Sequence, residues 1–598
     1  MISRKPIASC IALLAFAAAL WTARPASAQE GDSGPTRIVV VISSTDALIA
    51  DLEHMVVDLA GEEDKWENSV YPNIDIFLFG VDRERPIRFD QLIDGEGARR
   101  YQMVIPVSDL DEFIEDNLDP IGIIVDDVKN DDTLYELSDV FEGWMRFDNG
   151  YVAFAEKDFI NELPKEFDEV LGKHDVLLER GYDIGIQLDN TETSLDERRD
   201  GFANFKENVL AGVKKRPDET KEAYALRYAN SENSIETLEQ IYVESEDITV
   251  GLIVDKEKSE GRGDLRLIPV AETELAKFIA TLAEEPSHFA GFQAAENAIL
   301  SGRMNFALDD MLKEQLLEGY ELSKPVAHQR IDETEGITDD QKAARKEISD
   351  TLFDLFSGIQ EISVWDGFVQ VTPNDSGLHT GIFAGKTAEG TKVDAIVELL
   401  PKGHEGFTSE LNVDEAGGVS IHKVSMGDGY PNAFKEFFGD EGAFYVGTSK
   451  DAVWLSIGDG ALDAMKEGVE AVAAGGGAES DRTILEADLN LLPILKLMYQ
   501  LRQDGDFDLM QTLNDAAEES SEPEDGEEEE DSETAQMLKD FEWREAAIAA
   551  LAGENDKIHI LLQRSEEGDI TGEATSASGI LKTIGELIAK FADENLGG

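Results

Sequence analysis

A strand–turn–strand–helix pattern at Asp247–Leu282 is the feature that most constrains how this chain can fold. Two β-rich runs, Ile248–Val254 and Leu265–Val270, flank a charged turn that suits a hairpin. The apolar residues that follow have helical spacing and form one stripe: Leu275, Phe278, Ile279 and Leu282. A hairpin with a helix on one face is a building block of α+β proteins, so the pattern predicts antiparallel sheet covered by helices.

A related unit closes the chain. Lys557–Leu562 and Ile570–Thr575 flank a Glu-Glu-Gly turn and lead into a predicted helix from Gly579. Two earlier pairs of segments match in the same order, Tyr151 with Val453 and Ile184 with Ile484, and the three offsets are about 302, 300 and 310 residues. Matches in one order at similar offsets predict an internal duplication. We place the boundary near residue 290.

The predicted fold class is α+β, with curved antiparallel sheets, helices packed on one face and two related halves. Residues 37–290 form the N-terminal half and residues 291–598 the C-terminal half. Further strands are predicted at Ile38–Ile42, Ile74–Phe79, Tyr101–Val107, Phe368–Thr372, Gly377–Ala384, Val393–Leu400 and Val419–Ser425.

The N-terminus has the pattern of a secretory signal peptide covering residues 1–28. Arg4 and Lys5 precede an apolar run, and Ala26-Ser27-Ala28 is an A-x-A site, so cleavage is expected between Ala28 and Gln29. A retained membrane anchor is the alternative. Residues 29–36 read as a short polar linker. The chain is thus expected to be exported, to a periplasmic or extracellular location. Cys10 is its one cysteine, so the mature chain would have no disulfide and no thiolate chemistry.

The formal net charge is −74. Such a chain is disfavoured as a partner of nucleic acid or of an anionic membrane surface, because both require basic surface. No later segment approaches a membrane-spanning run, so no transmembrane segment is expected after signal removal. The acidity fits either a saline medium or a role in cation binding.

One tract, residues 515–533, holds twelve acids in nineteen residues and is predicted to be a disordered acidic loop. Weak capture of divalent cations is the functional alternative to a solvated insertion. The acids considered for it are Asp515, Glu518, Glu519, Glu527, Glu528, Glu529 and Glu530.

Motifs for chemistry are few. Ser420 and Lys423 fit S-x-x-K by letter, but they lie in a predicted strand rather than at a helix start. Asp189–Asp200 matches a calcium loop at its first and last positions only, and Ser194 stands where the loop requires glycine. The sequence therefore assigns no catalytic residue, metal ligand or cofactor, and an enzyme is less expected than a binding protein.

Four features together resemble large uncharacterised exported proteins of planctomycete-type bacteria. They are the signal sequence, the acidic composition, the Ile105-Pro106 strand followed by Phe113, and the Ile184 strand entering paired helices. The resemblance implies export and modular construction, and it carries no catalytic residue.

Three functions stay open. The first is a non-catalytic binding or scaffolding protein of the cell envelope, and it is ranked first because the narrow helical stripes leave no apolar surface over. The second is a carrier of an apolar ligand, and the third is a hydrolase with a site not readable from sequence. A carrier would need an apolar wall. The aromatic candidates for it, which core packing explains equally well, are Trp144, Phe147, Tyr151, Phe154, Phe444, Tyr445 and Trp454.

Overall fold

The structure is a computed structural model that describes residues 36–93, 99–129, 131–157, 175–217, 219–358, 362–475, 480–503 and 544–595. The predicted signal peptide, its cleavage point at Ala28 and Gln29, and the acidic tract 515–533 lie outside these residues.

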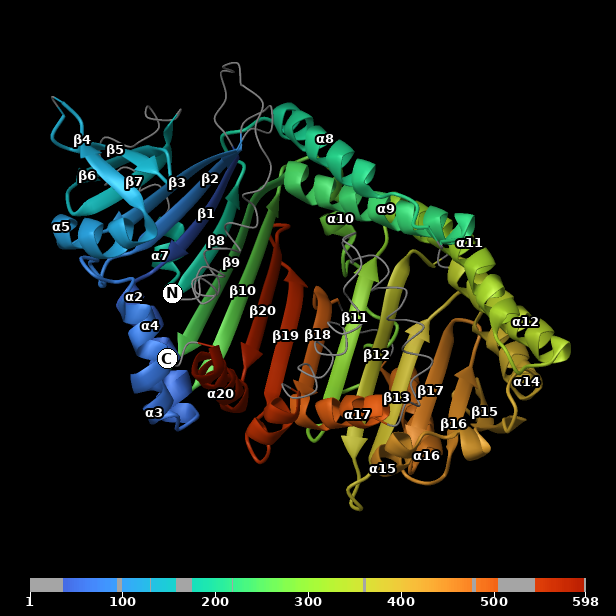
Figure 1. The fold of residues 1–598 in the computed structure, drawn as a ribbon. Coiled ribbons are helices and arrows are strands. Elements are labelled where there is room, and N and C mark those ends of the chain that lie inside the picture. The colour runs from blue at the N-terminus through green and yellow to red at the C-terminus, as the bar shows by residue number, and fades with distance from the viewer. Residues whose placement is uncertain are drawn as a thin grey trace.

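The described strands form one open antiparallel sheet of twenty strands (Figure 1). Its two edges are β4, which pairs with β5, and β14, which pairs with β15. Pairing runs in the following order: β4 (Ile123–Asp127), β5 (Leu134–Asp139), β6 (Gly143–Asp148), β7 (Tyr151–Glu156), β3 (Arg99–Pro106), β2 (Ile87–Ile93), β1 (Thr36–Ile42), β8 (Ile184–Asp189), β9 (Ser245–Asp255), β10 (Glu260–Pro269), β20 (Ile570–Ser576), β19 (Lys557–Arg564), β18 (Thr483–Asn490), β11 (Leu300–Ala307), β12 (Val364–Pro373), β13 (His379–Lys386), β17 (Ala452–Gly458), β16 (Ala443–Thr448), β15 (Val419–Ser425) and β14 (Thr408–Ala416).

The two halves of the chain build the two halves of this sheet in the same strand order. In the first half the order is β4-β5-β6-β7-β3-β2-β1-β8-β9-β10, and in the second it is β14-β15-β16-β17-β13-β12-β11-β18-β19-β20. The antiparallel pair β10–β20 joins them. Two copies of one unit would produce this arrangement, and the duplication itself stays a prediction.

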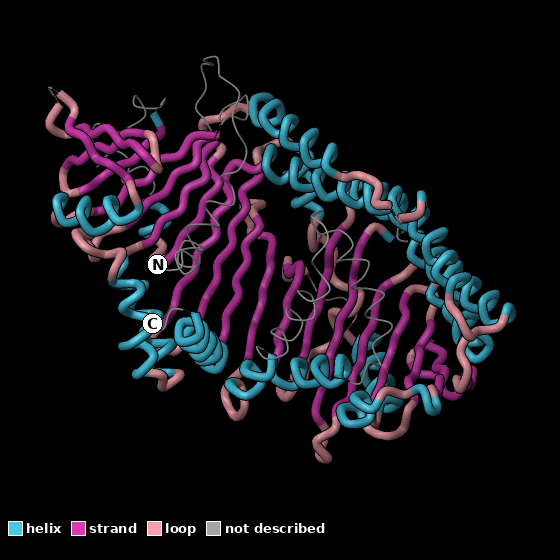
Figure 2. Tube along the Cα trace, viewed as in Figure 1, coloured by secondary structure: helices cyan, strands magenta, loops and turns pink. Residues whose placement is uncertain are grey.

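Helices lie along both ends of the central strands (Figures 1 and 2). One row contains α8 (Leu195–Gly212), α9 (Lys221–Glu244), α11 (Asp310–Glu333) and α12 (Asp339–Ser357); the other contains α20 (Ser578–Asn595) and α17 (Leu491–Gln503). The other α-helices of the described residues are α2 (Thr45–Glu53), α3 (Glu63–Lys65), α4 (Tyr71–Asp75), α5 (Leu110–Phe113), α7 (Asp175–Glu179), α10 (Glu274–Thr281), α14 (Val393–Gly403), α15 (Asn432–Phe438) and α16 (Ala461–Ala474). A π-helical turn, His54–Leu59, extends α2.

Side-chain caps define where the first row of helices begins. The side chains of Ser194, Thr220, Asp309 and Thr338 accept hydrogen bonds from the first-turn N–H groups of α8, α9, α11 and α12. Such a cap satisfies a donor that has no partner within the helix and contributes about 1 kcal/mol. The strong caps explain how helices with weakly apolar faces start at defined residues.

The structure confirms the α+β class and both hairpin–helix units, with β9–β10–α10 and β19–β20–α20 in the predicted places. Two strand predictions are wrong. Val393–Leu400 lies in helix α14, because its buried residues Val393, Ile396 and Val397 have helical spacing, which a short apolar run does not distinguish from a strand. Ile74–Phe79 contains the end of α4 and a turn, because Pro72 at the helix start favours helix over strand.

Compact cores lie towards the outer parts of the sheet. In the C-terminal half, α16 covers one face with Met465 against Trp454, and α14 covers the other with Val397 near Val446. Three of the aromatic residues considered for a ligand wall, Tyr151, Tyr445 and Trp454, are buried in such cores, which confirms core packing for them.

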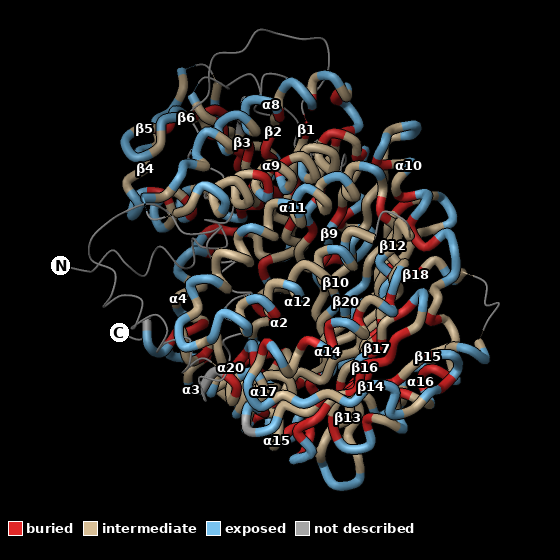
Figure 3. The backbone as a smooth tube through the Cα atoms, turned by 90° about the vertical axis from the view of Figure 1, so that its right-hand side faces the viewer, coloured by how far each residue is buried: buried red, intermediate tan, exposed pale blue. Residues whose placement is uncertain are grey.

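The centre of the sheet is different. None of the residues of β10, β20 and β19 is buried, whereas buried residues concentrate around β16, β17 and α16 (Figure 3). Among the described residues, the centre of the sheet is therefore less covered than the outer strands, although α10 packs over Leu267, Leu562 and Ile570.

Candidate functional site

One face of the central sheet is apolar across many strands. Directly paired residues of neighbouring strands share a face, so the register shows which side chains meet. Val250 pairs with Leu265, Leu265 with Gly572 and Gly572 with Leu562. The same row continues through Leu485 to Met304. We call this side of the sheet the apolar face.

Large apolar side chains on this face are open to solvent. Eight of them are 36–49% exposed: Ile186, Val250, Leu252, Leu265, Met304, Trp365, Leu455 and Ile560. They come from both halves of the chain and lie on either side of the β10–β20 join. Full burial of a leucine side chain stabilises the folded state by about 1.5–3 kcal/mol. Each half-exposed side chain could therefore gain roughly 1 kcal/mol more if a ligand covered it. A contiguous exposed apolar surface on this scale is typical of a binding site.

The opposite face of the same strands is charged. On it Arg262 binds Asp264, Arg266 binds Asp569, and Arg303 binds Glu486. In an antiparallel sheet, such a polar face is normally exposed to solvent, and the apolar face packs onto a core. Here the middle of the apolar face has no such core among the described residues. An apolar surface left exposed in this way indicates a binding site for a ligand or a partner.

Small residues open space between the exposed side chains. Gly263, Gly572, Ala574, Ala487 and Gly302 lie in adjacent rows of the apolar face. A Cβ at Gly263 would meet only Leu252 Cδ2 at 3.6 Å and the Gly251 carbonyl at 4.0 Å, which are ordinary contacts. The apolar face therefore has room above its backbone at this point.

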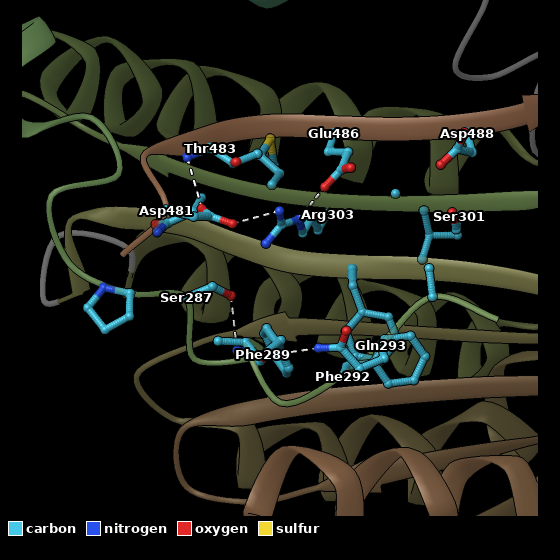
Figure 4. A pocket seen from close by; sticks show the side chains of 18 of the residues that line it. Ser287, Phe289, Phe292, Gln293, Ser301, Arg303, Asp481, Thr483, Glu486 and Asp488 are labelled. Atoms are coloured by element: carbon cyan, nitrogen blue, oxygen red, sulfur yellow. Dashed lines mark hydrogen bonds and ion pairs between the residues drawn. The ribbon is translucent and has the colours of Figure 1, made fainter. Parts of the chain in front are cut away.

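A cavity of about 500 Å³ lies on the charged face beside β11 and β18 (Figure 4). Arg303 is held between two acids, with Asp481 at 2.7 Å and Glu486 at 2.7 Å. The loop before β11 closes the other side, where Phe292 stacks on Phe368 with ring centroids 3.8 Å apart.

The polar groups of this cavity largely satisfy one another. Burial opposes ionisation of Asp481, but hydrogen bonds from Thr483 and Arg303 outweigh it and lower the pKa of Asp481. Asp488 accepts from Lys557 at 2.8 Å and contacts His559 at 3.2 Å. The cavity could hold a small polar molecule, yet its charges are already paired, and nothing in it resembles an activated nucleophile.

A second cavity, of about 700 Å³, is lined by residues of α8, α9, α10 and α11. Phe278 in its wall contacts Phe306, which stacks on the exposed Trp365. This cavity therefore borders the apolar face at the end of β11 and β12.

One set of contacts resembles the serine–histidine–acid triad of a hydrolase: Ser259 contacts His54, and His54 contacts Asp58. The Ser259 hydroxyl is 3.3 Å from His54 Nε2, and Asp58 is 2.9 Å from Nδ1. Ser259 lies in the β9–β10 turn with a φ of 52°. The Asp58 side chain is 67% exposed, whereas the acid of a triad is buried against its histidine. Together with the Lys256–Asp51 pair at 2.5 Å, this contact ties the hairpin turn to the first helix.

Residues of the two weak sequence motifs, S-x-x-K and the calcium-like segment, have structural roles. Ser420 and Lys423 lie three residues apart on β15 and so point to opposite faces, and Lys423 pairs with Glu441. Ser194 of the calcium-like segment caps α8. Within the described ranges no group of three His, Cys, Asp or Glu side chains could hold a metal. No helix there is long and apolar enough to cross a membrane.

Sequence reasoning missed the apolar face. The alternation of apolar and polar residues in β9, β10 and β19 is visible in the sequence. Only the pairing register shows that the apolar residues of the three strands lie on the same side of the sheet. The expectation that no apolar surface is left over is wrong, because it considered the helical stripes and not the sheet.

Fold and surface together define an α+β protein built on one open antiparallel sheet with an exposed apolar face. No family model, curated protein or solved structure matches this chain.

Proposed function

We propose that this is an exported binding protein that holds an apolar, chain-like molecule on the apolar face of its central sheet. The observation that carries the proposal is the set of eight exposed large apolar side chains that the strand register places on one side. Of the functions that the sequence left open, this favours the carrier over the scaffold.

The overall charge of the chain strengthens this choice. The acids exceed the bases by 74, and yet on this face the positions from β9 to β18 that carry the rows of Val250 and Leu252 are all apolar. The acidic tract 515–533 is a poor cover for such a surface, because burying ionised carboxylates against hydrocarbon is costly. A hydrocarbon chain suits the surface, since it has no polar groups to leave unpaired.

Binding of a neutral fluorescent hydrophobic probe to delipidated protein tests the proposal. We expect saturable binding, weakened at least tenfold by Gly263→Trp, which fills the open space, and by Leu252→Glu, which places a charge on the face. Gly212→Trp is the matched control, because a Cβ at Gly212 meets nothing within 4 Å and α8 packs away from the sheet on α9.

Native mass spectrometry of the protein before delipidation should show a bound small apolar molecule. A protein that neither carries such a molecule nor binds the probe would return the scaffold function to first place. So would probe binding that Gly263→Trp and Leu252→Glu leave unchanged.

The hydrolase alternative has one specific observation in its favour, the Ser259–His54–Asp58 contacts. A fluorophosphonate probe distinguishes it from simple binding. We expect no covalent labelling of Ser259, and labelling that is abolished by His54→Ala would establish an activated serine instead.

A further inference from the structure

One row of side chains crosses much of the apolar face. Direct pairing links one residue from each of ten strands, from Ile184 on β8 through Gly263 on β10 and Gly302 on β11 to Leu455 on β17. Each of these residues is glycine or carries a hydrocarbon side chain, and we call them the long row. Neighbouring strands lie about 4.8 Å apart, so the nine steps from β8 to β17 make the long row roughly 43 Å long.

The open part of the apolar face follows the long row. None of the residues in the long row is buried. Of the eight exposed side chains described above, all but Trp365 lie in the long row or in the row directly beside it, which runs from Ile186 to Met304. The exposed surface is therefore a strip that runs across the strands.

Helices stand on both sides of this strip (Figures 1 and 2). On one side α10 packs over Leu267, Leu562 and Ile570, of which Leu562 belongs to the row beside the long row. On the other side α20 lies against Gly261, and α17 packs in one cluster with Leu300. A molecule that ran along the strands would meet these helices, whereas a molecule that lies across the strands avoids them. The strip is thus a trough, and among the described residues the long row is its open floor.

The trough ends at α14. Val446 of β16 continues the long row beyond Leu455, and it is buried in one cluster with Val397 of α14. A ligand in the trough can therefore extend as far as Leu455 but not over β16.

A narrow apolar chain suits this trough better than another protein does. The helices on its two sides leave open only the long row and part of the row beside it. A second copy of this chain would also be repelled, since each copy has a formal net charge of −74.

We propose that the ligand is a single hydrocarbon chain of about thirty carbons that lies across the strands in this trough and crosses the β10–β20 join. This rests on the proposed function and names its ligand class, a very-long-chain lipid. An extended chain rises about 1.3 Å per carbon, because C–C bonds of about 1.5 Å alternate in direction, so sixteen carbons cover roughly half of the long row and thirty cover most of it.

Hexadecanol and triacontanol, alcohols with unbranched chains of sixteen and thirty carbons, are the two probes. Each is delivered from cyclodextrin and displaces the neutral fluorescent probe from delipidated protein. For the wild type, we expect native mass spectrometry to show one bound triacontanol per chain, and bound triacontanol should exclude hexadecanol from the trough.

Leu455→Glu places a charge at the far end of the long row. It should weaken binding of triacontanol at least tenfold, because the end of this chain would bury the carboxylate against hydrocarbon. Binding of hexadecanol should change less than twofold, since the shorter chain can lie nearer the join.

Leu411→Glu is the matched control. Leu411 is 42% exposed, compared with 39% for Leu455, but it lies on the edge strand β14, three strands beyond β17. This variant should bind both alcohols as the wild type does.

The outcomes separate this inference from the proposed function. Binding of triacontanol that Leu455→Glu leaves unchanged would overturn the inference and leave a shorter ligand at the join. So would a folded Leu455→Glu variant that binds both alcohols less well by the same factor. Simultaneous binding of triacontanol and hexadecanol by wild-type protein would also overturn it, and this measurement needs no variant. If neither alcohol binds wild-type protein, the proposed function fails, and this inference fails with it.

Discussion

Asp366 shows how one buried acid can set a local pH response. It accepts from the Ser287 hydroxyl at 2.6 Å and the His288 N–H at 2.5 Å, and so holds the loop before β11 against β12. Burial raises its pKa above the usual value of 3.8, and these hydrogen bonds only partly oppose the effect. The folded state therefore binds this proton more tightly than the unfolded state does.

The sign of the pH dependence follows from linkage. The contribution of Asp366 to stability is fully present below about pH 3.8 and is lost as the pH rises through the higher folded pKa. The free energy of unfolding of the wild type, minus that of Asp366→Asn, should fall as the pH rises from 4 and then level off. Urea titrations at several pH values measure it, with exposed Asp463→Asn as the control for loss of one charge. A difference that rises with pH would contradict the assignment.

The expected signal cleavage site leads to a separate prediction. Ala26-Ser27-Ala28 should direct cleavage before Gln29, because signal peptidase requires small residues at these positions. N-terminal sequencing of protein recovered from outside the cytoplasm checks this, and replacing Ala28 by a bulky residue should block processing. Recovered protein that begins at Met1 would contradict it.

At the scale of elements, the local sequence pattern is enough to predict a hairpin or helix where strand and turn signals agree. The β9–β10 and β19–β20 hairpins and helices α10 and α20 were predictable because turn residues separate runs of clear periodicity. The strand prediction for Val393–Leu400 is wrong, because a short apolar run taken by itself fits either a strand or a helix. The β10–β20 pairing was not predictable, since it joins residues some 310 positions apart and no local signal encodes it.

Gly585 in α20 tests how tightly one helix is docked. A Cβ at this position would overlap the backbone carbonyl of Met55 in the π-helical turn. Alanine is a better helix former than glycine by about 1 kcal/mol, but overpacking typically costs about 1–3 kcal/mol, and backbone gives way less easily than a side chain. Gly585→Ala should therefore lower stability.

Gly319→Ala in α11 is the matched control for Gly585→Ala. A Cβ there meets nothing within 4 Å, so only the gain in helix propensity remains, and the variant should be about 0.5–1 kcal/mol more stable. Denaturant midpoints of the two variants measure both effects. A stabilising Gly585→Ala would show that α20 is not held against this turn.

At the scale of the whole molecule, the repeated strand order and the apolar face are connected. The two ten-strand units meet at β10–β20, and the exposed apolar side chains extend from this join into both units. Within the described residues, the helices that pack near the join are α10, over Leu267 and Ile570, and α20, beside Gly261. They leave the middle of the two strands open between them, which is where we place the ligand.

The last prediction concerns the effect of salt on stability, and it follows from the net charge of the whole chain. Even if every base were paired, 74 acids would have no partner, and their mutual repulsion destabilises the compact state. Added monovalent salt shortens the Debye length from about 10 Å at 0.1 M to about 3 Å at 1 M and screens this repulsion. The same salt weakens exposed ion pairs such as Lys258–Asp255, but each of these contributes only about 0–1 kcal/mol. Repulsion should therefore dominate, and the melting temperature should rise steadily with the concentration of a weakly interacting salt. A flat or falling melting temperature would contradict this balance, and stabilisation by micromolar calcium without added salt would show that specific cation binding stabilises the fold.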